Sequence, residues 1–436
     1  MSTLSSPLPS LPRIVVVGGG FGGLSVTRAL RGSRCRVILL DRQNHHVFQP
    51  LLYQVATAAL SPADIAQPIR SILRGQDNVQ VVLGDVESLD PEHKIVRLES
   101  DDVSYDWLVL APGVTHAYFG NDHWARRAPG LKTIDDALEI RRRMLLAFEE
   151  AELEDDRAVR HAKLTFVIVG GGPTGVELAG ALREIAAETI PRDFRRVDTS
   201  TTRVILMEGQ DRLLPGMSSR ASERALRHLE RMGVEVRLGA LVTDMDDLTV
   251  TVGEEAVPAA NVIWAAGVQG SSLARSLGAE LDHQGRVKVE PDCSVPGYPE
   301  VFVVGDLAFL WDPETGKPVP GVAQGAIQMG RFVGGVIRDG LAQGGPAAVR
   351  RPFHYVDKGT LATIGRARAV ADIGELSFGG FFAWILWSTV HVLYLIGFRN
   401  RVLVMVNWAW QWLIRSRGAR LITGNPRLRI TKPADL

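Results

Sequence analysis

A glycine-rich turn of the same form occurs twice in the sequence, each time after a short run of β-branched residues, in VVVGGGFGG and VIVGGGPTG. In the spacing G-x-G-x-x-G the two copies place Gly18, Gly20 and Gly23, and Gly170, Gly172 and Gly175. The first glycine allows a tight turn, the second lets backbone N–H groups approach a pyrophosphate, and the third allows a helix to pack closely on a strand. Two copies predict two dinucleotide-binding folds in one chain.

An acidic residue ends the strand that follows each copy. CRVILLD ends in Asp41, 23 residues beyond the first glycine of its motif, where a carboxylate accepts hydrogen bonds from ribose hydroxyls. RVILME ends in Glu208, 38 residues beyond its own first glycine, so a longer helix and loop must absorb the excess. An acid repels a 2′-phosphate, which favours NADH over NADPH. Arg203 and Arg212, nearby in the sequence, weaken that preference.

A third strand, EVFVVGD, ends in Gly305 and Asp306. With two dinucleotide folds upstream, an aspartate at this place can bind the ribitol chain of FAD. WLVLAPG and VIWAAG also end in small residues, past which a ligand can run close to the backbone. The first cradle and the Gly-Asp strand would hold FAD, and the second cradle, inserted between them, would hold NADH. The flavin would supply the redox chemistry and the protein its orientation.

Composition excludes several other classes of protein. The 436 residues include only two cysteines, Cys35 and Cys293, and no CxxC, which argues against a disulfide scaffold, a zinc or other metal site and a redox-active dithiol. The formal net charge is zero, so no basic field favours nucleic acid. The first residues lack the charged segment of a signal peptide, and we expect a cytoplasmic catalytic body.

The C-terminal region is unusually apolar. Leu376–Phe398 contains no Asp, Glu, Lys or Arg, and a single helix of that length would reach about 30 Å, enough to cross a bilayer core. In the next segment, Val402–Ile414, polar residues recur every four positions and predict one polar stripe on an apolar helix. With the residue that follows, the stripe consists of Asn407, Gln411 and Arg415. The first segment gathers Ser388, His391 and Tyr394 on one side.

Two further features favour a helix pair that lies on a membrane. Tryptophan prefers the headgroup level, and five of the nine tryptophans fall in this region: Trp384, Trp387, Trp408, Trp410 and Trp412. The last 38 residues hold eight Arg or Lys and one acid, which suits an anionic leaflet. A true membrane span is the second interpretation. A homodimer interface or a buried core is the third.

Taken together, these segments resemble the type II NADH dehydrogenases, the single-subunit NADH:quinone oxidoreductases of respiratory membranes. The resemblance also rests on HHVFQPLLYQVATAALSPADIAQPIR, VIWAAGV, VVGDLA, VAQGAIQMG, DKGTLATIG and GFFAWILWSTVHVLYLIGFRNR. It implies a flavoprotein of the electron-transport chain with FAD as prosthetic group, NADH as donor and a membrane quinone (ubiquinone or menaquinone) as acceptor, which pumps no protons. It also implies a peripheral or monotopic place on the cytoplasmic face of a bacterial inner membrane.

The expected fold is α/β, with two Rossmann-like domains and a C-terminal region of amphipathic anchoring helices. The predicted FAD-binding domain comprises residues 1–120 and 286–375, and the NADH-binding domain residues 161–285. Residues 121–160 connect them. Residues 376–436 form the anchor, and lipid contact is expected over residues 376–420.

The motifs and the resemblance together assign site residues. Those predicted to bind FAD are Gly18, Gly20, Gly22, Gly23, Asp41, Arg42, Val86, Ala111, Gly113, Asp306, Ala323 and Gln324. Those predicted to bind NADH are Gly170, Gly172, Gly175, Glu177, Glu208, Ala266 and Gly267. Those predicted to act in catalysis are Glu177 beside the nicotinamide, Gln324 and Gln328 on the quinone side of the flavin, and Lys358 near flavin and quinone.

Several of these residues have a simpler interpretation. Glu177 can be interpreted as a carboxylate in the first turn of its helix, where its negative charge stabilises the helix dipole. Lys358 can be interpreted as a solvent-exposed lysine in a loop. His391 fits a helix-surface histidine better than a proton donor, and structural hydrogen bonding is the preferred interpretation of His45 and His46.

Three rival functions remain open on the sequence. The first is a soluble ferredoxin reductase or disulfide reductase. Neither enzyme would need the aromatic C-terminal region, and the absence of a dithiol argues further against a disulfide reductase. A sulfide:quinone reductase uses several catalytic cysteines, and two is too few. A flavoprotein that senses NADH with slow turnover is the rival outside the enzymes.

Overall fold

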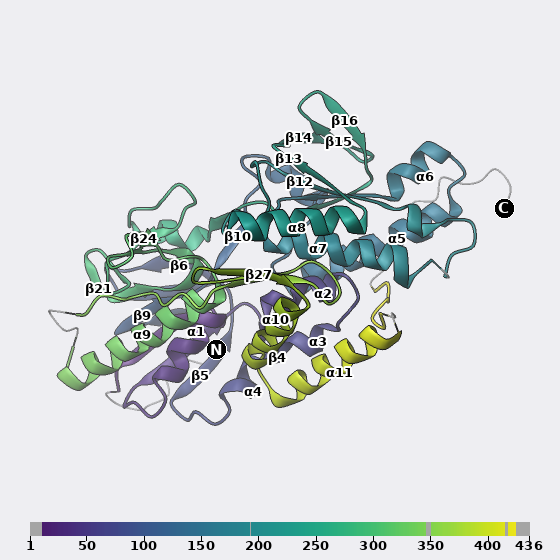
Figure 1. Cartoon of the computed structure of the whole chain (residues 1–436). Coiled ribbons are helices and arrows are strands. Elements are labelled where there is room, and N and C mark those ends of the chain that lie inside the picture. Colours follow the sequence, from purple (N-terminus) through teal and green to yellow (C-terminus); the bar gives the residue numbers. More distant parts are fainter. Residues whose placement is uncertain (1–10, 192, 346–349, 415–416, 424–436) are drawn as a thin grey trace. The chain divides into compact units, whose positions relative to one another are not determined.

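The computed structural model describes residues 11–191, 193–345, 350–414 and 417–423. The chain divides into two compact units, each assembled from three separate stretches of sequence (Figure 1). The first unit contains residues 1–46, 67–115 and 268–357, and the second contains residues 47–66, 116–267 and 358–436. Each unit has the mixed α/β architecture expected from the sequence, with a parallel sheet at its centre.

A six-stranded sheet in the order β20-β21-β9-β1-β2-β5 forms the centre of the first unit, and all its pairings are parallel except that of β20 with β21. The strands are β1 (Arg13–Val17), β2 (Arg36–Asp41), β5 (Val79–Leu83), β9 (Trp107–Leu110), β20 (Ser294–Val295) and β21 (Tyr298–Val303). The residues of β1, β2 and β9 are almost all buried, as continuous β-branched and leucine runs predict for parallel strands covered on both faces. The edge strand β5 is only partly buried.

Helices α1 (Phe21–Ala29) and α9 (Ala323–Gln343) pack side by side in the first unit (Figure 1). The contact is made by small residues, because a Cβ on Gly330 would lie 2.4 Å from the Gly22 carbonyl oxygen and a Cβ on Gly334 2.5 Å from Ala29 Cβ. Gly330 contacts Gly22 and Gly334 contacts Ala29, so the residue numbers of the contacts increase in the same direction along both helices. The two helices are therefore parallel. Their N-termini therefore lie at the same end of the pair.

Shorter elements complete the first unit. A three-stranded antiparallel sheet joins β6, β7 and β8, and two small two-stranded sheets pair β19 with β22 and β23 with β24. The bounds are β6 (Val86–Asp90), β7 (Ile95–Leu98), β8 (Asp102–Ser104), β19 (Val287–Lys288), β22 (Ala308–Phe309), β23 (Trp311–Asp312), β24 (Lys317–Pro318), α4 (Ile69–Leu73), η5 (Ser272–Leu277) and η6 (Gly305–Leu307).

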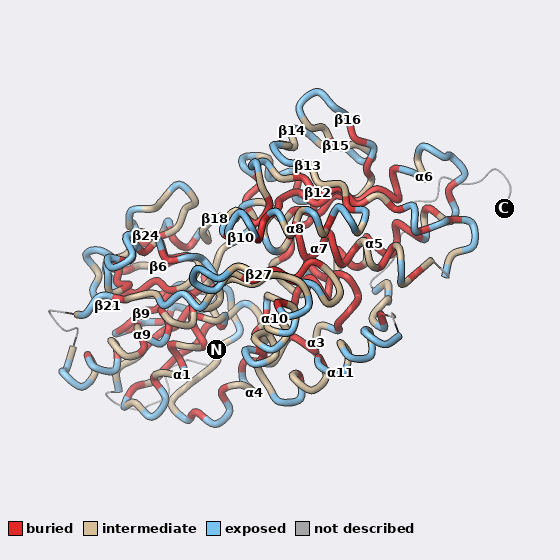
Figure 2. Tube along the Cα trace, viewed as in Figure 1, coloured by how far each residue is buried: buried red, intermediate tan, exposed pale blue. Residues whose placement is uncertain are grey.

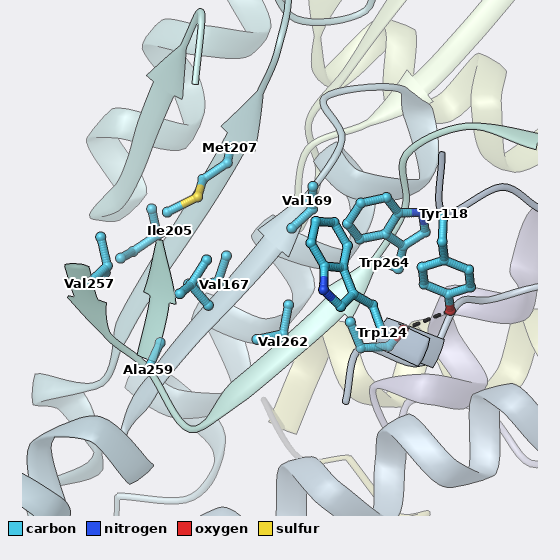
Figure 3. Close-up of a cluster of buried hydrophobic side chains, with 12 residues drawn as sticks. Tyr118, Trp124, Val167, Val169, Ile205, Met207, Val257, Ala259, Val262 and Trp264 are labelled. Carbon is cyan, nitrogen blue, oxygen red and sulfur yellow. Dashed lines mark hydrogen bonds between the residues drawn. The ribbon is translucent and has the colours of Figure 1, made fainter. Parts of the chain in front are cut away.

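A second parallel sheet, in the order β13-β12-β11-β17, forms the centre of the second unit. Its strands and the helices that follow them are β11 (Thr165–Val169), α7 (Pro173–Glu184), β12 (Arg203–Glu208), α8 (Ser219–Met232), β13 (Val234–Leu238) and β17 (Asn261–Trp264). The core on this sheet is aromatic at one end, where Tyr118 stacks on Trp264 with ring centroids 5.1 Å apart and donates a 2.8 Å hydrogen bond to the Ala128 carbonyl (Figure 3).

Around this sheet lie an antiparallel sheet and several helices. The sheet contains β14 (Val242–Met245), β15 (Thr249–Val252) and β16 (Glu255–Pro258). The helices are α2 (Leu52–Ala56), α3 (Pro62–Ile65), α5 (Ile134–Leu153) and α6 (Arg157–Lys163). Four short strands lie where the chain passes between the units: β3 (His45–Val47), β4 (Ala66–Pro68), β10 (Val114–His116) and β18 (Val268–Gly270).

The C-terminal part of the second unit differs from a long apolar helix. Leu376–Phe398 is not a single helix, because its first five residues form β27 (Leu376–Gly380) in the sheet β25-β26-β27, and α10 (Phe381–Tyr394) follows. The other elements are β25 (Thr360–Thr363), β26 (Ala369–Ile373) and α11 (Phe398–Ile414). Within the described residues, every helix is too short or too polar to cross a bilayer.

The polar stripe of α11 contacts protein and does not face water. Asn407 Nδ2 lies 3.5 Å from Asp64 Oδ2, and Gln411 Nε2 donates a 2.5 Å hydrogen bond to the Ala59 carbonyl. Arg415, the third residue of the predicted stripe, lies outside the described residues. The opposite face is apolar and exposed, and exposed stretches run along both α10 and α11 (Figure 2). The large exposed side chains are Phe381, Phe382, Ile385, Leu393, Tyr394, Phe398, Met405, Val406, Trp410, Trp412, Leu413 and Ile414.

The division into units differs from the predicted domain boundaries in several places, and residues 116–160, predicted as the end of the FAD-binding part and a connecting segment, lie in the second unit. Residues 47–66 join the second unit, because α11 and the residues after it hydrogen-bond to them. Residues 268–285 join the first unit, where Ser276 Oγ accepts a hydrogen bond from the Leu89 N–H. Residues 358–436 belong with the second unit, in which β25 packs on α7 and β26 on α8. No local sequence pattern records these distant contacts.

Candidate functional site

The first cradle lies between β1 and α1, at the carboxyl ends of the parallel strands. Gly18 has φ +99°, and a Cβ there would lie 2.3 Å from the Ala111 carbonyl oxygen, so only glycine fits between the two strand ends. A Cβ on Gly23 would lie 1.8 Å from the Gly18 carbonyl oxygen. Around Gly20 the space is open, since no atom of the described residues lies within 4 Å of a Cβ built there. The second glycine of the motif therefore faces room for a ligand at the N-terminus of α1.

Asp41 closes the edge of this cradle. Its carboxylate accepts hydrogen bonds from the backbone N–H groups of Gly19, at 2.5 Å, and Gln43, at 2.7 Å. Burial raises the pKa of the Asp41 carboxyl, and these two hydrogen bonds oppose the shift. His46 supports the same turn, since its Nδ1 lies 3.1 Å from the Gly19 carbonyl oxygen. Burial lowers the pKa of His46 to about 4, so the ring is neutral at pH 7, in keeping with a structural role.

The other FAD-cradle predictions fall in the same unit. Asp306 lies in η6, and a Cβ on Gly321 would lie 3.7 Å from its carboxylate. Ala323 is the first residue of α9 and Gln324 the second, both half-buried. Of the remaining residues, Gly22 and Ala111 are buried, and Val86 is buried at the start of β6. Gly113 has φ +74°, and no atom of the described residues lies within 4 Å of a Cβ built there. Arg42 is exposed.

Gln328 has a structural partner for both polar atoms of its amide. Nε2 donates to the Val356 carbonyl at 2.9 Å, and Oε1 accepts from the Val356 N–H at 3.0 Å. The side chain pairs with the backbone as a neighbouring β-strand would. Gln328 therefore holds the segment that ends the first unit, directly before Lys358 in the sequence.

The second cradle repeats the first almost feature by feature. Gly170 has φ +110°, and a Cβ there would lie 2.6 Å from the carbonyl carbon of Ala265, at the end of the neighbouring β17. A Cβ on Gly175 would lie 1.8 Å from the Gly170 carbonyl oxygen. In the part of the chain that the structure describes, no atom lies within 4 Å of a Cβ on Gly172. Ala266 and Gly267 follow at the same edge. Ala266 is half-buried, and Gly267 is exposed and has φ +71°.

Glu208 takes the place that Asp41 has in the first cradle. Its carboxylate accepts hydrogen bonds from the N–H groups of Gly171, at 2.6 Å, and Gln210, at 2.8 Å. The long spacing is absorbed as the sequence indicated, because a π-helical turn, Ile185–Thr189, extends α7 before the loop returns to β12. The two arginines that weakened the NADH preference have other partners: Arg203 pairs with Glu235, and Arg212 donates to the Pro215 carbonyl and Ser219 Oγ.

A cavity of about 120 Å³ opens within the second unit and contains Glu177. Glu177 is the fifth residue of α7, and the first turn of that helix holds no acid, so the first-turn interpretation is wrong. Glu177 is 8% exposed, and its Oε1 accepts a 3.4 Å hydrogen bond from the Thr363 N–H. Burial raises its pKa to about 8, so it is mostly protonated at pH 7. It lies among tryptophans of α10 and α11 and residues of α2.

This pKa predicts how stability depends on pH. An acid whose pKa is raised on folding destabilises the fold progressively as pH rises from about 4.5 towards 8, because only the unfolded chain ionises freely there. Glu177→Gln removes the effect and should raise the free energy of unfolding by a few kcal/mol at pH 8 and hardly at all at pH 4.5. Denaturant unfolding of the two proteins across this range measures the difference. An offset that does not change with pH would contradict the assignment.

The remaining candidates lie in the second unit. Lys358 is exposed, and its Nζ lies 3.4 Å from Tyr394 Oη on α10. His391 Nδ1 lies 2.7 Å from the Trp387 carbonyl oxygen and its ring stacks on the Trp387 indole. Burial lowers the pKa of His391 to about 4, and the contacts agree with a structural role.

Comparisons with known proteins decide the family. Residues 12–330 match the pyridine nucleotide-disulphide oxidoreductase family, and residues 358–417 match the NDH2 C-terminal domain. The chain is 45% identical to the type II NADH:quinone oxidoreductase Ndh of Mycobacterium tuberculosis, over 98% of this chain and 94% of that protein. The chain belongs to the type II NADH:quinone oxidoreductase family.

Solved structures agree on the fold of this type II family. The structure of NDH2 from Plasmodium falciparum in complex with NADH superposes with a TM-score of 0.84 at 20% identity, covering 95% of this chain and all of that one. The sulfide:quinone oxidoreductase of Aquifex aeolicus reaches a TM-score of 0.71 at 18% identity, covering 90% of this chain and 92% of that one. The fold is therefore shared with a rival function, and the sequence family separates the two.

Sequence reasoning missed four residues that shape the cavity. Tyr53 and Gln54 lie in the family-like segment after His45, but nothing local indicated that they face a cavity. The other two form a buried ion pair in which Arg417 Nη2 lies 2.9 Å from Glu184 Oε2. These partners are 233 positions apart in the chain, so no sequence pattern could join them.

Proposed function

We propose that the chain is a respiratory NADH:quinone oxidoreductase that passes a hydride from NADH to FAD and two electrons to a membrane quinone without pumping protons. The observation that carries the proposal is the pair of matching cradles, each open at its second glycine and each closed by a carboxylate that bonds the glycine turn. Family membership supports the same donor and acceptor.

The first cradle fits FAD. Open space at Gly20 leaves room for a pyrophosphate at the N-terminus of α1, and the parallel packing of α1 and α9 brings a second helix N-terminus to the same end. A helix N-terminus stabilises the negative charge of a reduced flavin. When bound, FAD supplies the hydride and electron chemistry, and Asp41, Asp306 and the backbone at Gly20 hold it.

The proposed roles of the polar residues follow from their positions. Glu177, protonated and buried, positions the nicotinamide from the NADH-binding unit. Gln324, near the start of α9, offers a neutral amide to a flavin or quinone carbonyl without burying a charge. Gln328 contributes to the acceptor side by holding the backbone at Val356. Lys358 supplies a positive charge near the acceptor.

We further propose that α10 and α11 lie on the surface of a bilayer, on the cytoplasmic face of a bacterial inner membrane. A helix of a water-soluble protein turns its apolar face inward, whereas α11 turns its polar stripe inward and its apolar face outward. Trp410 is exposed on α11 and suits the headgroup level, while Trp387 is buried. Of the basic residues, Arg417 is buried in its ion pair and Arg399 is exposed.

Steady-state oxidation of NADH by the membrane-bound or detergent-purified protein tests the function. We expect turnover that depends on an added short-chain quinone. A slow, quinone-independent reaction would favour the NADH sensor. Quinone reduction driven by sulfide and not by NADH would favour the sulfide:quinone reductase.

Exchange of Glu208 tests the second cradle. Glu208→Gln removes the charge that accepts ribose hydroxyls and repels a 2′-phosphate, while its carbonyl oxygen can still accept the Gly171 N–H. We expect kcat/KM to fall about tenfold for NADH and to fall less, or to rise, for NADPH. Arg203→Gln is the matched control and should leave the ratio of the two substrates unchanged, because Arg203 pairs with Glu235. Equal losses with both nucleotides would argue against ribose recognition.

A further inference from the structure

A chain of hydrogen bonds runs from α11 to the wall of the Glu177 cavity. Trp408 Nε1 donates to Gln54 Oε1 at 2.7 Å, and Gln54 Nε2 donates to Tyr53 Oη at 2.9 Å. Tyr53 and Gln54 are each 7% exposed, and all three side chains line the cavity. This series of hydrogen bonds connects α11 with the residues around Glu177.

The direction of each hydrogen bond is fixed by the first one. An indole N–H can only donate, so the Gln54 amide must turn its oxygen to Trp408 and its NH₂ to Tyr53. The Tyr53 oxygen is then an acceptor for Gln54, and its own proton has to point elsewhere. Burial raises the pKa of Tyr53 well above 10, so the hydroxyl keeps that proton at pH 7. Within the described residues, the Tyr53 hydroxyl has no protein acceptor at hydrogen-bond distance.

A second donor on the cavity wall also lacks a protein partner. Trp387 is 2% exposed and lines the cavity, and its Nε1 makes no hydrogen bond within the described part of the chain. A buried polar group without a partner costs free energy, which a ligand acceptor would recover. Two donors and several aromatic rings around one space suit a flat ring that carries a carbonyl oxygen.

We propose that Tyr53 is a hydrogen-bond donor to a carbonyl-bearing ring in this cavity, and that Gln54, held by Trp408 of α11, is the positioning residue that turns the Tyr53 proton towards the ring. The inference rests on the proposed function, which offers two such rings: the carboxamide-bearing nicotinamide and the quinone. Arg141 of α5 fixes the α2 turn that carries both residues, through hydrogen bonds of 2.7 Å to the carbonyls of Val55 and Leu60.

Two substitutions separate the donor from its orientation. Tyr53→Phe removes the hydroxyl and keeps the ring. Gln54→Glu keeps an acceptor for Trp408 but replaces the amide donor with a second oxygen, so the Tyr53 proton turns to residue 54 and away from the cavity. Asn400→Ala is the control, because Asn400 bonds the Ala66 carbonyl from the same helix and does not line the cavity. The full-length, FAD-loaded protein is used throughout.

The readouts are the dissociation constant of NAD⁺ by calorimetry, the dissociation constant of a short-chain quinone by tryptophan fluorescence, and the thermal unfolding midpoint. We expect Tyr53→Phe and Gln54→Glu each to weaken one of the two ligands about three- to tenfold and to leave the other unchanged. Weaker NAD⁺ identifies the nicotinamide as the ring, and weaker quinone identifies the quinone. The double variant should lose no more than Tyr53→Phe alone, since both changes remove the same donor.

The proposal is overturned if neither ligand weakens, if both weaken equally, or if the two losses add in the double variant. Asn400→Ala should bind both ligands as the wild type does, and binding losses in it would assign the effect to disturbed packing of α11. Failure of the proposed function looks different, because the wild-type protein itself would then bind neither ligand or fail to reduce quinone with NADH.

Discussion

Replacing Phe382, Phe398 and Leu413 together by serine should release the protein from lipid vesicles while it stays folded and keeps its flavin. These side chains are 78%, 82% and 70% exposed on α10 and α11, so they contribute little to the fold. Burying each in a bilayer interface is worth about 1.5–3 kcal/mol. Losing all three should lower the membrane partition coefficient about a thousandfold or more. Co-sedimentation with anionic vesicles measures it.

The matched control for this experiment is Trp311→Ser. Trp311 is 55% exposed on the short hairpin of β23 and β24 in the first unit and lies outside the exposed apolar surface of α10 and α11. Its loss should leave vesicle binding unchanged. If the triple variant still sediments with vesicles, the apolar face of α10 and α11 is not the membrane contact, and a homodimer interface becomes the better explanation. Sedimentation velocity of the wild type and the triple variant would then show it.

Valine at the second glycine of either cradle should remove one nucleotide and spare the other. Gly20 and Gly172 have extended backbones, with φ −73° and −70°, and none of the described residues has an atom within 4 Å of a Cβ at either place. The free protein therefore accepts a side chain there, whereas a bound pyrophosphate does not. We expect Gly20→Val to be purified without FAD. Gly172→Val should retain FAD and bind NADH at least about tenfold more weakly, because backbone hydrogen bonds to the phosphates are lost.

The third glycine provides the contrast. A Cβ on Gly175 would lie 1.8 Å from the Gly170 carbonyl oxygen, so Gly175→Ala should lower the thermal stability of the protein itself. Gly172→Val should leave the unfolding midpoint of the nucleotide-free protein unchanged. If Gly172→Val instead binds NADH normally, or if Gly20→Val keeps its flavin, the assignment of the cradles is wrong. Flavin absorbance and NADH titration report both outcomes.

The cradles were predictable from sequence because their determinants are local. Gly18 and Gly170 adopt positive φ next to the neighbouring strand, and Asp41 and Glu208 end the following strands and bond the glycine turns. Each of these features lies within one strand–turn–helix–strand unit.

Features that depend on distant contacts could not be predicted. A polar stripe of period four on α11 fits a helix that faces water on that side equally well, and only the hydrogen bonds of Asn407 and Gln411 to residues 59–64 show that it faces protein. The amides of Gln324 and Gln328 look equivalent in sequence, yet Gln328 is paired with the Val356 backbone. The strand β27 forms because β26 is there to pair with it, which overrides the apolar helical pattern of its residues.

The most direct test of the account is the flavin absorbance of the purified protein during anaerobic addition of NADH, followed by addition of a short-chain quinone. We predict that one equivalent of NADH bleaches the flavin band and that the quinone restores it, with NAD⁺ and quinol formed in equal amounts. A flavin that NADH does not bleach, or that bleaches and is not restored by quinone, would contradict the assignment as an NADH:quinone oxidoreductase.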